Sequence, residues 1–258
     1  MTVSRIYLPQ PMQPGDRCEL TGENRQYVLS VLRMKKGDRL LLFDGSGYEY
    51  TAVILGHDHE RIDLEITGQE VIHGERSQII LAQSLPKAKK MDFIIEKASE
   101  LGANTIIPFF SERSILRLGP ERSKLKQVRW QKIALEAARK SHSAGIPEVR
   151  EILTLEKMLR SAGQEALKII FWEEETGTNL REFLQREKGL TERDIFLVVG
   201  PEGGFTRQEI ALAEDRGFTS VTLGRQILKV ETAALAILAI IQYARGVFGG
   251  ALEGGENS

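Results

Sequence analysis

Cysteine is nearly absent from this chain of 258 residues: Cys18 is the only one, which excludes an intrachain disulfide. Long apolar runs are also absent, because the longest, residues 233–241, has nine residues and a membrane-spanning helix needs about 20. The first residues lack the apolar segment of a signal peptide. Together these absences predict a reduced, cytoplasmic location without membrane association.

The common nucleotide and metal motifs are missing too. No Gly-x-x-x-x-Gly-Lys-Ser/Thr occurs, and no Gly-x-Gly-x-x-Gly follows an expected strand, which argues against P-loop and Rossmann nucleotide sites. Histidine is scarce, and His57 and His59 lie between two expected strands with no third ligand nearby. This pattern favours a solvated loop, so no metal site is predicted.

The net charge of −1 conceals an uneven distribution. Residues 85–145 hold 13 Lys and Arg against 6 Asp and Glu, a net charge of +7, whereas the segments on either side are acidic. A basic segment within a neutral protein indicates a surface that binds a polyanion. Composition alone is equally compatible with lysines on solvated helix faces.

The first 75 residues are rich in short β-branched or alternating runs separated by turn residues. We expect strands at residues 5–8, 39–43, 48–54 and 61–66, and one helix at residues 23–32. Several short strands with one helix indicate a small β-barrel.

From residue 78 onward, strand and helix patterns alternate, which is typical of a parallel sheet covered by helices. Strands are expected at residues 78–83, 105–110, 168–172, 195–199 and 220–223. Helices are expected at residues 91–101, 124–141, 179–186, 207–216 and 231–243. The predicted domains are therefore residues 1–74 and 75–248, followed by a glycine-rich, disordered tail at 249–258.

The sharpest local feature is the loop Gly200-Pro-Glu-Gly-Gly204, which follows an entirely apolar strand. Thr206 and Glu209 then have capping-box spacing, so a helix follows the loop. Ligands of parallel sheets bind beyond the carboxyl ends of strands, and glycines let backbone approach a ligand closely. Three glycines with Pro201 and Glu202 favour a functional loop over a plain turn. The acidic residue and the absence of Lys or Arg favour a neutral or cationic ligand over ATP.

A second loop, residues 223–229, follows the next expected strand and leads into the last helix. Glu231 and Thr232 lie in the first turn of that helix, where the helix dipole favours an acid. By itself this position is equally consistent with a functional role and with capping alone.

Taken together, the two loops resemble the knotted methyltransferases of the SPOUT class, and specifically the ribosomal RNA small subunit methyltransferase E family. The resemblance covers most of the chain, and its most specific parts are Gly200-Pro-Glu-Gly-Gly-Phe205 and Leu223-Gly-x-x-Ile-Leu-x-x-Glu-Thr-Ala233. Weaker matches are Lys90-Met-Asp92, Lys97-Ala-Ser-Glu-Leu-Gly102, Ile107-Pro108, Ser111-Glu-Arg-Ser114, Trp130-Gln-Lys-Ile133, Ile146-Pro-Glu-Val149, Leu32-Arg-Met34 and Phe43-Asp-Gly45.

The resemblance implies an α/β fold: a trefoil-knotted SPOUT domain preceded by a PUA-like, RNA-binding β-barrel. It implies methyl transfer from S-adenosylmethionine to N3 of one uridine in the 16S ribosomal RNA of the small subunit. It also implies a homodimer, with each cofactor site near the subunit interface. The residues expected to bind the cofactor are Trp172, Gly200, Pro201, Glu202, Gly203, Leu223, Gly224, Ile227, Leu228 and Thr232.

This chain departs from the family pattern at a few positions. Gln226 and Lys229 stand where the family usually has arginines, and Lys229 keeps the charge but not the planar fork of Arg. Lys140 and Ser143 stand where it tends to have Gln and Arg. These changes concern RNA and uridine contacts and leave the cofactor loops intact.

Methylation at N3 requires loss of the N3 proton from a base that is unpaired or flipped out. Glu202 and Glu231 are candidate proton acceptors, and Lys229 is a candidate cation that would favour the uridine anion. The sequence does not choose among these three residues. The candidate RNA-binding residues are Arg5, Arg25, Arg33, Lys87, Lys89, Lys90, Arg113 and Lys140.

Two other functions fit parts of the pattern. A ribosome assembly factor that binds RNA without catalysis needs only the barrel and the basic segment, although the intact glycine loops argue against it. A knotted methyltransferase that acts on another RNA position, at a ribose 2′-hydroxyl or at guanine, would keep the same loops.

Overall fold

The computed structural model describes residues 5–71, 77–87, 90–114, 118–141, 143 and 145–249. The chain divides into two compact units: Met1–Glu75 with Ala138–Ile146, and Arg76–Ala137 with Pro147–Ser258. The disordered tail expected at 249–258 lies outside the described residues apart from Gly249, and Lys89 lies outside them as well.

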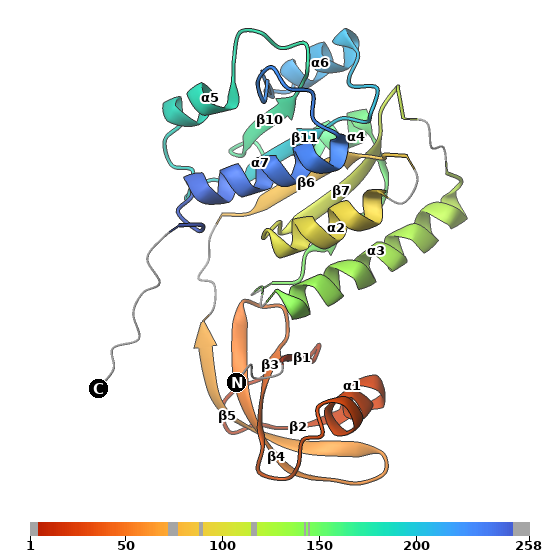
Figure 1. Ribbon diagram of the computed structural model, residues 1–258, viewed down its shortest axis with the longest axis vertical. Helices are drawn as coiled ribbons and strands as arrows, with labels where there is room; N and C mark the ends of the chain where they lie inside the picture. Colours follow the sequence, from red (N-terminus) through yellow and green to blue (C-terminus); the bar gives the residue numbers. More distant parts are fainter. Residues whose placement is uncertain are drawn as a thin grey trace. The chain divides into compact units, whose positions relative to one another are not determined.

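The first unit is a five-stranded sheet around its own apolar core (Figure 1). Its strands are β1 (Arg5–Tyr7), β2 (Arg17–Thr21), β3 (Arg39–Phe43), β4 (Tyr48–His57) and β5 (Arg61–Val71). They lie in the order β1-β3-β4-β5-β2, and all pairs except β1 with β3 are antiparallel. Alternate residues of β4 and β5, such as Ile54 and Leu64, are buried, as period-two patterning requires.

The helix expected at residues 23–32 is in fact two elements. α1 (Gly22–Gln26) is followed by one π-helical turn, η1 (Tyr27–Val31), in which the Leu32 N–H donates to the Tyr27 carbonyl over 3.0 Å. Val28 in this turn is fully buried, whereas the exposed Arg33 that follows has a left-handed φ of +54°. The wider turn thus seats Val28 in the core while the chain reverses sharply at Arg33.

The second unit contains a sheet in which every pairing is parallel, as expected from the alternation of strands and helices. Its strands are β6 (Ile79–Ser84), β7 (Thr105–Phe110), β8 (Glu148–Val149), β9 (Leu153–Thr154), β10 (Leu167–Phe171), β11 (Ile195–Val199) and β12 (Thr219–Val221). The order is β12-β10-β11-β6-β7-β8, and β9 also pairs with β7. The central strands β11, β6 and β7 are almost continuously apolar because both faces of the sheet are covered.

Helices cover both faces of this sheet (Figure 1). They are α2 (Lys90–Glu100), α3 (Pro120–Lys140), α4 (Leu155–Arg160), α5 (Leu180–Arg186), α6 (Arg207–Glu214) and α7 (Val230–Ala244). Buried residues of α2, α3, α5 and α7 share one core with one face of the sheet, and those of α4 and α6 share a second core with the other. Among the described residues, no helix has the length and apolarity needed to span a membrane.

Candidate functional site

The loops that follow β6, β7, β10, β11 and β12 leave the sheet at its carboxyl edge, because all these strands run in parallel. Both loops singled out in the sequence, residues 200–204 and 223–229, belong to this set. This edge is where ligands of open parallel sheets bind. The structure thus brings the two loops to one edge of one sheet.

Backbone geometry explains one glycine of the first loop directly. Gly204 has a φ of +67°, and a Cβ there would collide with the carboxylate of Glu173. Its N–H donates to the Pro201 carbonyl over 3.0 Å, which closes the turn. The predicted capping box is confirmed: Thr206 and Glu209 each bond the other's backbone N–H at the start of α6.

Side chains from neighbouring strands brace this loop from outside it. The buried Gln83, in β6, has its Nε2 3.4 Å from the carbonyl oxygen of Val199 and 3.3 Å from that of Gly200. Arg113, which follows β7, donates from Nη1 to the Gly203 carbonyl over 2.7 Å. Arg113 is therefore held on the loop that we expected to bind cofactor, rather than standing apart as an RNA contact.

Lys90, the first residue of α2, lies between two of the candidate catalytic carboxylates. Its Nζ is 3.1 Å from Glu202 Oε1 and 3.1 Å from Glu231 Oε2. Glu202 also accepts the Lys87 N–H, at 3.1 Å and 3.3 Å from its two oxygens. Lys90 was expected to contact RNA, but its ammonium forms ion pairs with Glu202 and Glu231 between the two loops.

These contacts favour the charged form of all three side chains. The pKa of Lys90 is raised, first by its hydrogen bond to Glu231 and then by that to Glu202. Burial alone would raise the pKa of Glu202, but hydrogen bonds from its own N–H, from Lys90 and from the Lys87 N–H lower it below its ordinary value. The pKa of Glu231 is also lowered, chiefly by its own backbone N–H and then by Lys90, against the opposing effect of burial. Both carboxylates are therefore ionised at neutral pH.

The second loop is more open than the first. Gly224 has a φ of +108°, and its N–H donates to Thr222 Oγ1 over 3.2 Å. Leu223 packs partly against the core, Leu228 is half-buried, and Ile227 is 90% exposed. An apolar side chain with that exposure is available to cover an apolar ligand or another chain.

The remaining cofactor candidates lie at the same edge. Trp172 directly follows β10, and its buried Nε1 has no hydrogen-bond partner among the described residues. Pro201 is buried, Thr232 is exposed in the first turn of α7, and Lys229 is the N-cap of that helix. The unpaired indole N–H is notable because buried donors are ordinarily paired.

The prediction that Arg5 binds RNA is wrong. Its side chain is 1% exposed, forms an ion pair with Glu49 over 2.5 Å, and donates to the Ala138 carbonyl. Its guanidinium also lies over the Phe43 ring, 3.8 Å from the centroid. A guanidinium enclosed in this way has no surface left for a phosphate.

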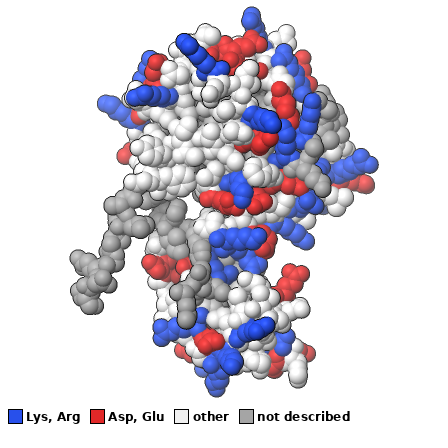
Figure 2. Space-filling view, in the orientation of Figure 1, with Lys and Arg blue, Asp and Glu red and all other residues white. Residues whose placement is uncertain are grey.

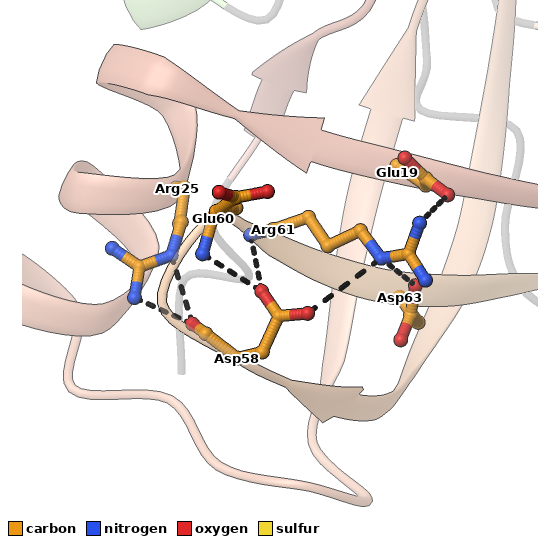
Figure 3. Close-up of polar contacts among 6 residues, drawn as sticks. All are labelled: Glu19, Arg25, Asp58, Glu60, Arg61 and Asp63. Atoms are coloured by element: carbon orange, nitrogen blue, oxygen red, sulfur yellow. Dashed lines mark hydrogen bonds and ion pairs between the residues drawn. The ribbon is translucent and has the colours of Figure 1, made fainter.

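Arg25 is tied to its own unit (Figure 3). It donates twice to the Asp58 carbonyl, at 3.2 Å and 2.7 Å, and so fastens α1 to the hairpin between β4 and β5. The Asp58 carboxylate accepts the N–H groups of Glu60 and Arg61, which lower its pKa. This network indicates a structural role for Arg25.

Besides Arg113, three of the RNA candidates keep exposed side chains: Arg33 and Lys140 in the first unit, and Lys87 in the second. Figure 2 shows that Lys and Arg are interspersed with Asp and Glu over the face in view, rather than forming one continuous basic surface there. Lys89 lies outside the described residues. Within the part of the chain that is described, no group of three or more His, Cys, Asp or Glu could hold a metal ion.

Sequence reasoning missed several polar residues that shape this edge. Gln83 is one, and the others are three buried serines, Ser84, Ser111 and Ser114, whose hydroxyl oxygens lie 2.8–3.0 Å from one another. In the sequence, the available indication was that polar residues stand where the apolar strands β6 and β7 end. The same pattern is equally typical of the start of an ordinary loop. These hydroxyls join the ends of β6 and β7 beneath the Arg113 loop.

A parallel α/β sheet with two glycine loops at its carboxyl edge defines a class of ligand-binding α/β domain, and comparison with known proteins identifies the family. The family model for the RNA methyltransferase domain matches residues 73–242, and the family model for the RNA methyltransferase PUA domain matches residues 20–67. The chain belongs to the ribosomal RNA small subunit methyltransferase E family. This confirms the family resemblance and the α/β fold with an N-terminal PUA domain, while the trefoil knot stays a prediction.

Three relatives illustrate the similarity. The chain is 34% identical to "Ribosomal RNA small subunit methyltransferase E" of Synechocystis sp., covering 86% of this chain and 71% of that protein. It is 29% identical to the protein of the same name in Bacillus subtilis, covering 91% and 93%. A crystal structure of the Neisseria gonorrhoeae protein of that name, bound to S-adenosyl methionine, matches this chain with a TM-score of 0.81. The two sequences are 33% identical, and the match covers 93% of this chain and 97% of that one.

Proposed function

We propose that this chain transfers a methyl group from S-adenosylmethionine to N3 of one uridine in the 16S RNA of the small ribosomal subunit. The observation that carries the proposal is the convergence of the loops at residues 200–204 and 223–229 at one carboxyl edge. Relatives named as ribosomal RNA small subunit methyltransferases, matched over 91% and 86% of this chain, support it. We propose a cytoplasmic location, because the proposed substrate is ribosomal.

The residues at this edge suit S-adenosylmethionine, which has a sulfonium cation, an adenine and no phosphate. Lys90, Glu202 and Glu231 together carry a net charge of −1, because one ammonium faces two carboxylates. Leu223, Leu228 and the exposed Ile227 offer apolar contacts for an adenine. The unpaired N–H of Trp172 is a donor that a ligand could satisfy.

The ionisation states favour one of the three catalytic candidates. When bound, S-adenosylmethionine supplies a methyl group that forms the new bond to N3 as its bond to sulfur breaks. Glu202 and Glu231 are weak bases, because their pKa values are lowered and both already accept hydrogen bonds. A cation that stabilises the uridine anion after N3 loses its proton to solvent suits this site better. Lys229, at the N-cap of α7 and near enough to lower the pKa of Glu231, is that cation.

Calorimetry with S-adenosylmethionine, followed by transfer of labelled methyl to unmodified small ribosomal subunits, tests the proposal. We expect micromolar binding and one methyl group per subunit. Absence of binding by the folded protein would favour the non-catalytic assembly factor. Binding with transfer to ribose or guanine would favour a knotted methyltransferase of another specificity.

RNA affinity should depend on the exposed cations of the first unit. Replacing both Arg33 and Lys140 with alanine is expected to weaken binding to the small subunit and to lower the slope of log affinity against log salt by roughly 0.7–0.9 for each lost phosphate contact. Filter binding at several salt concentrations measures both effects. The matched control is the double alanine variant at Arg186 and Lys188, which loses the same charge elsewhere. Equal effects in the two variants would show that only bulk charge matters.

We also propose that the enzyme is a homodimer formed through α7. One side of α7 packs in the core, but Ile240 and Tyr243 remain exposed, and Figure 2 shows little charge over the C-terminal half of the helix. Such an apolar face favours burial against a second chain. Tyr243→Glu is expected to convert the dimer into a monomer in light scattering at micromolar concentration. The control is Leu125→Glu, because Leu125 and Tyr243 are both 71% exposed. This variant should leave the dimer intact. A monomeric wild-type protein would contradict the proposal.

A further inference from the structure

Lys90 connects three segments that are far apart in the sequence. Its ammonium lies at the start of α2 and forms ion pairs with Glu202, in the loop after β11, and with Glu231, in the first turn of α7. Both distances are 3.1 Å. We call Lys90, Glu202 and Glu231 the lysine clasp. It joins the two loops proposed to hold the cofactor through a single side chain.

A backbone group also holds one member of the lysine clasp, Glu202. The Lys87 N–H donates to Glu202, so the segment before α2 holds that carboxylate through backbone as well as through the ammonium. The side chains of Lys90, Glu202 and Glu231 are 32%, 24% and 22% exposed, so water only partly screens their charges. The shifted pKa values described above keep all three groups charged across the physiological range.

Removal of the ammonium would leave the carboxylates of Glu202 and Glu231 close together without the cation that pairs with both. Like charges in partly buried positions repel, and the backbone that carries them can relieve the repulsion by moving apart. That backbone belongs to the loop at 200–204 and to the start of α7. Loops displaced in this way are no longer preorganised for a bound ligand, which weakens its binding.

We propose that Lys90 is a positioning residue of the cofactor site, rather than a phosphate contact, and that it holds the two cofactor loops at the spacing that S-adenosylmethionine requires. The inference rests on the proposed function for the identity of the ligand. It rests on the ion pairs themselves for the position of the loops. Lys90→Glu would weaken cofactor binding as well, because it would place three carboxylates together.

The decisive variant is Lys90→Met, which keeps an unbranched side chain, shorter by the terminal nitrogen, and removes the charge. We expect calorimetric affinity for S-adenosylmethionine to fall about tenfold or more, as truncated charge pairs commonly show. In methylation assays the KM for S-adenosylmethionine should rise by a similar factor, while kcat at saturation stays within about threefold. Lys90→Arg, which restores the charge, should recover most of the affinity.

The control is Lys97→Met on the same helix. Lys97 also forms two ion pairs, with Glu96 and Glu100, and its side chain is 31% exposed, but neither partner belongs to a cofactor loop. Its loss should leave S-adenosylmethionine affinity unchanged. An equal decrease in both variants would assign the effect to the helix and overturn the proposal.

Hydrogen exchange in the ligand-free protein tests the clasp without any cofactor. Lys90→Met should accelerate amide exchange in residues 200–204 and 229–232 and leave β6 and β11 protected. If wild-type protein binds no S-adenosylmethionine, the proposed function fails, and this comparison still decides whether the clasp orders the loops. Should Lys90→Met fail to fold, Glu231→Gln removes one link alone and should accelerate exchange at residues 229–232.

The salt dependence of RNA binding separates the two assignments of Lys90. As a positioning residue, it can be replaced with Met without changing the slope of log affinity against log salt. The proposal is overturned if Lys90→Met lowers that slope by roughly 0.7–0.9 and leaves S-adenosylmethionine affinity and loop exchange at wild-type values.

Discussion

Replacing Gly203 with leucine is expected to weaken S-adenosylmethionine binding by about a hundredfold or more while the protein stays folded. A Cβ at this position would lie 3.3 Å from Arg113 Cβ and 3.4 Å from Arg113 Cδ, and a larger side chain would need still more room. Arg113 would have to give up its hydrogen bond to the Gly203 carbonyl, and the loop would move with it. Forcing extra bulk into a packed position costs about 1–3 kcal/mol, and the upper end of that range is about a hundredfold in affinity. Calorimetry measures the loss, and circular dichroism confirms the fold.

Gly163→Leu is the control for that experiment. Gly163 is exposed, and a Cβ there would meet only the Ala166 side chain at 4.0 Å. Both variants add the same apolar side chain to the surface of the same unit. Wild-type affinity in a folded Gly203→Leu variant would show that the loop at 200–204 does not contact the cofactor.

Lys229→Met is expected to lower kcat by about two to three orders of magnitude, the usual effect of removing one preorganised group that stabilises a developing anion. Affinity for S-adenosylmethionine should change by no more than about threefold, since Lys229 is proposed to act on the uridine. Single-turnover methylation of small subunits measures the chemical step, and calorimetry measures the affinity.

Lys229→Arg supplies the matched comparison. It keeps the positive charge and introduces the arginine that the family usually has at this position. It should retain at least about a tenth of wild-type kcat. If Lys229→Met is as fast as wild type and Glu231→Gln is slow, the carboxylate is the proton acceptor and the assignment to Lys229 is wrong.

Sequence patterns predicted most of the fold because the long elements have clear periodicity. The expected strands at residues 105–110 and 195–199 match β7 and β11 at both ends, and the expected helix at 231–243 differs from α7 by one residue at each end. Short elements were missed, namely β2, β8, β9 and α4, because two to six residues are too few to establish a period. The π-helical turn at residues 27–31 was missed because a helical apolar pattern does not distinguish α from π bonding.

The candidate site was predicted in part for a similar reason. Glycine loops after apolar strands carry a local signal, so residues 200–204 and 223–229 could be placed at one edge of the sheet. The partners of long cationic side chains carry no such signal. Arg5 and Lys90 look like free cations in the sequence, but one is buried against Glu49 and the other bridges Glu202 and Glu231. Only the tertiary fold brings those carboxylates to them.

Mapping the methylated atom tests the central claim most directly. Small ribosomal subunits that lack the modification are incubated with the protein and isotopically labelled S-adenosylmethionine, and the 16S RNA is digested and analysed as nucleosides by mass spectrometry. The account predicts label in 3-methyluridine at a single position, and none with Gly203→Leu at the same cofactor concentration. Label in a 2′-O-methyl nucleoside or a methylguanosine, with unlabelled uridine N3, would contradict it.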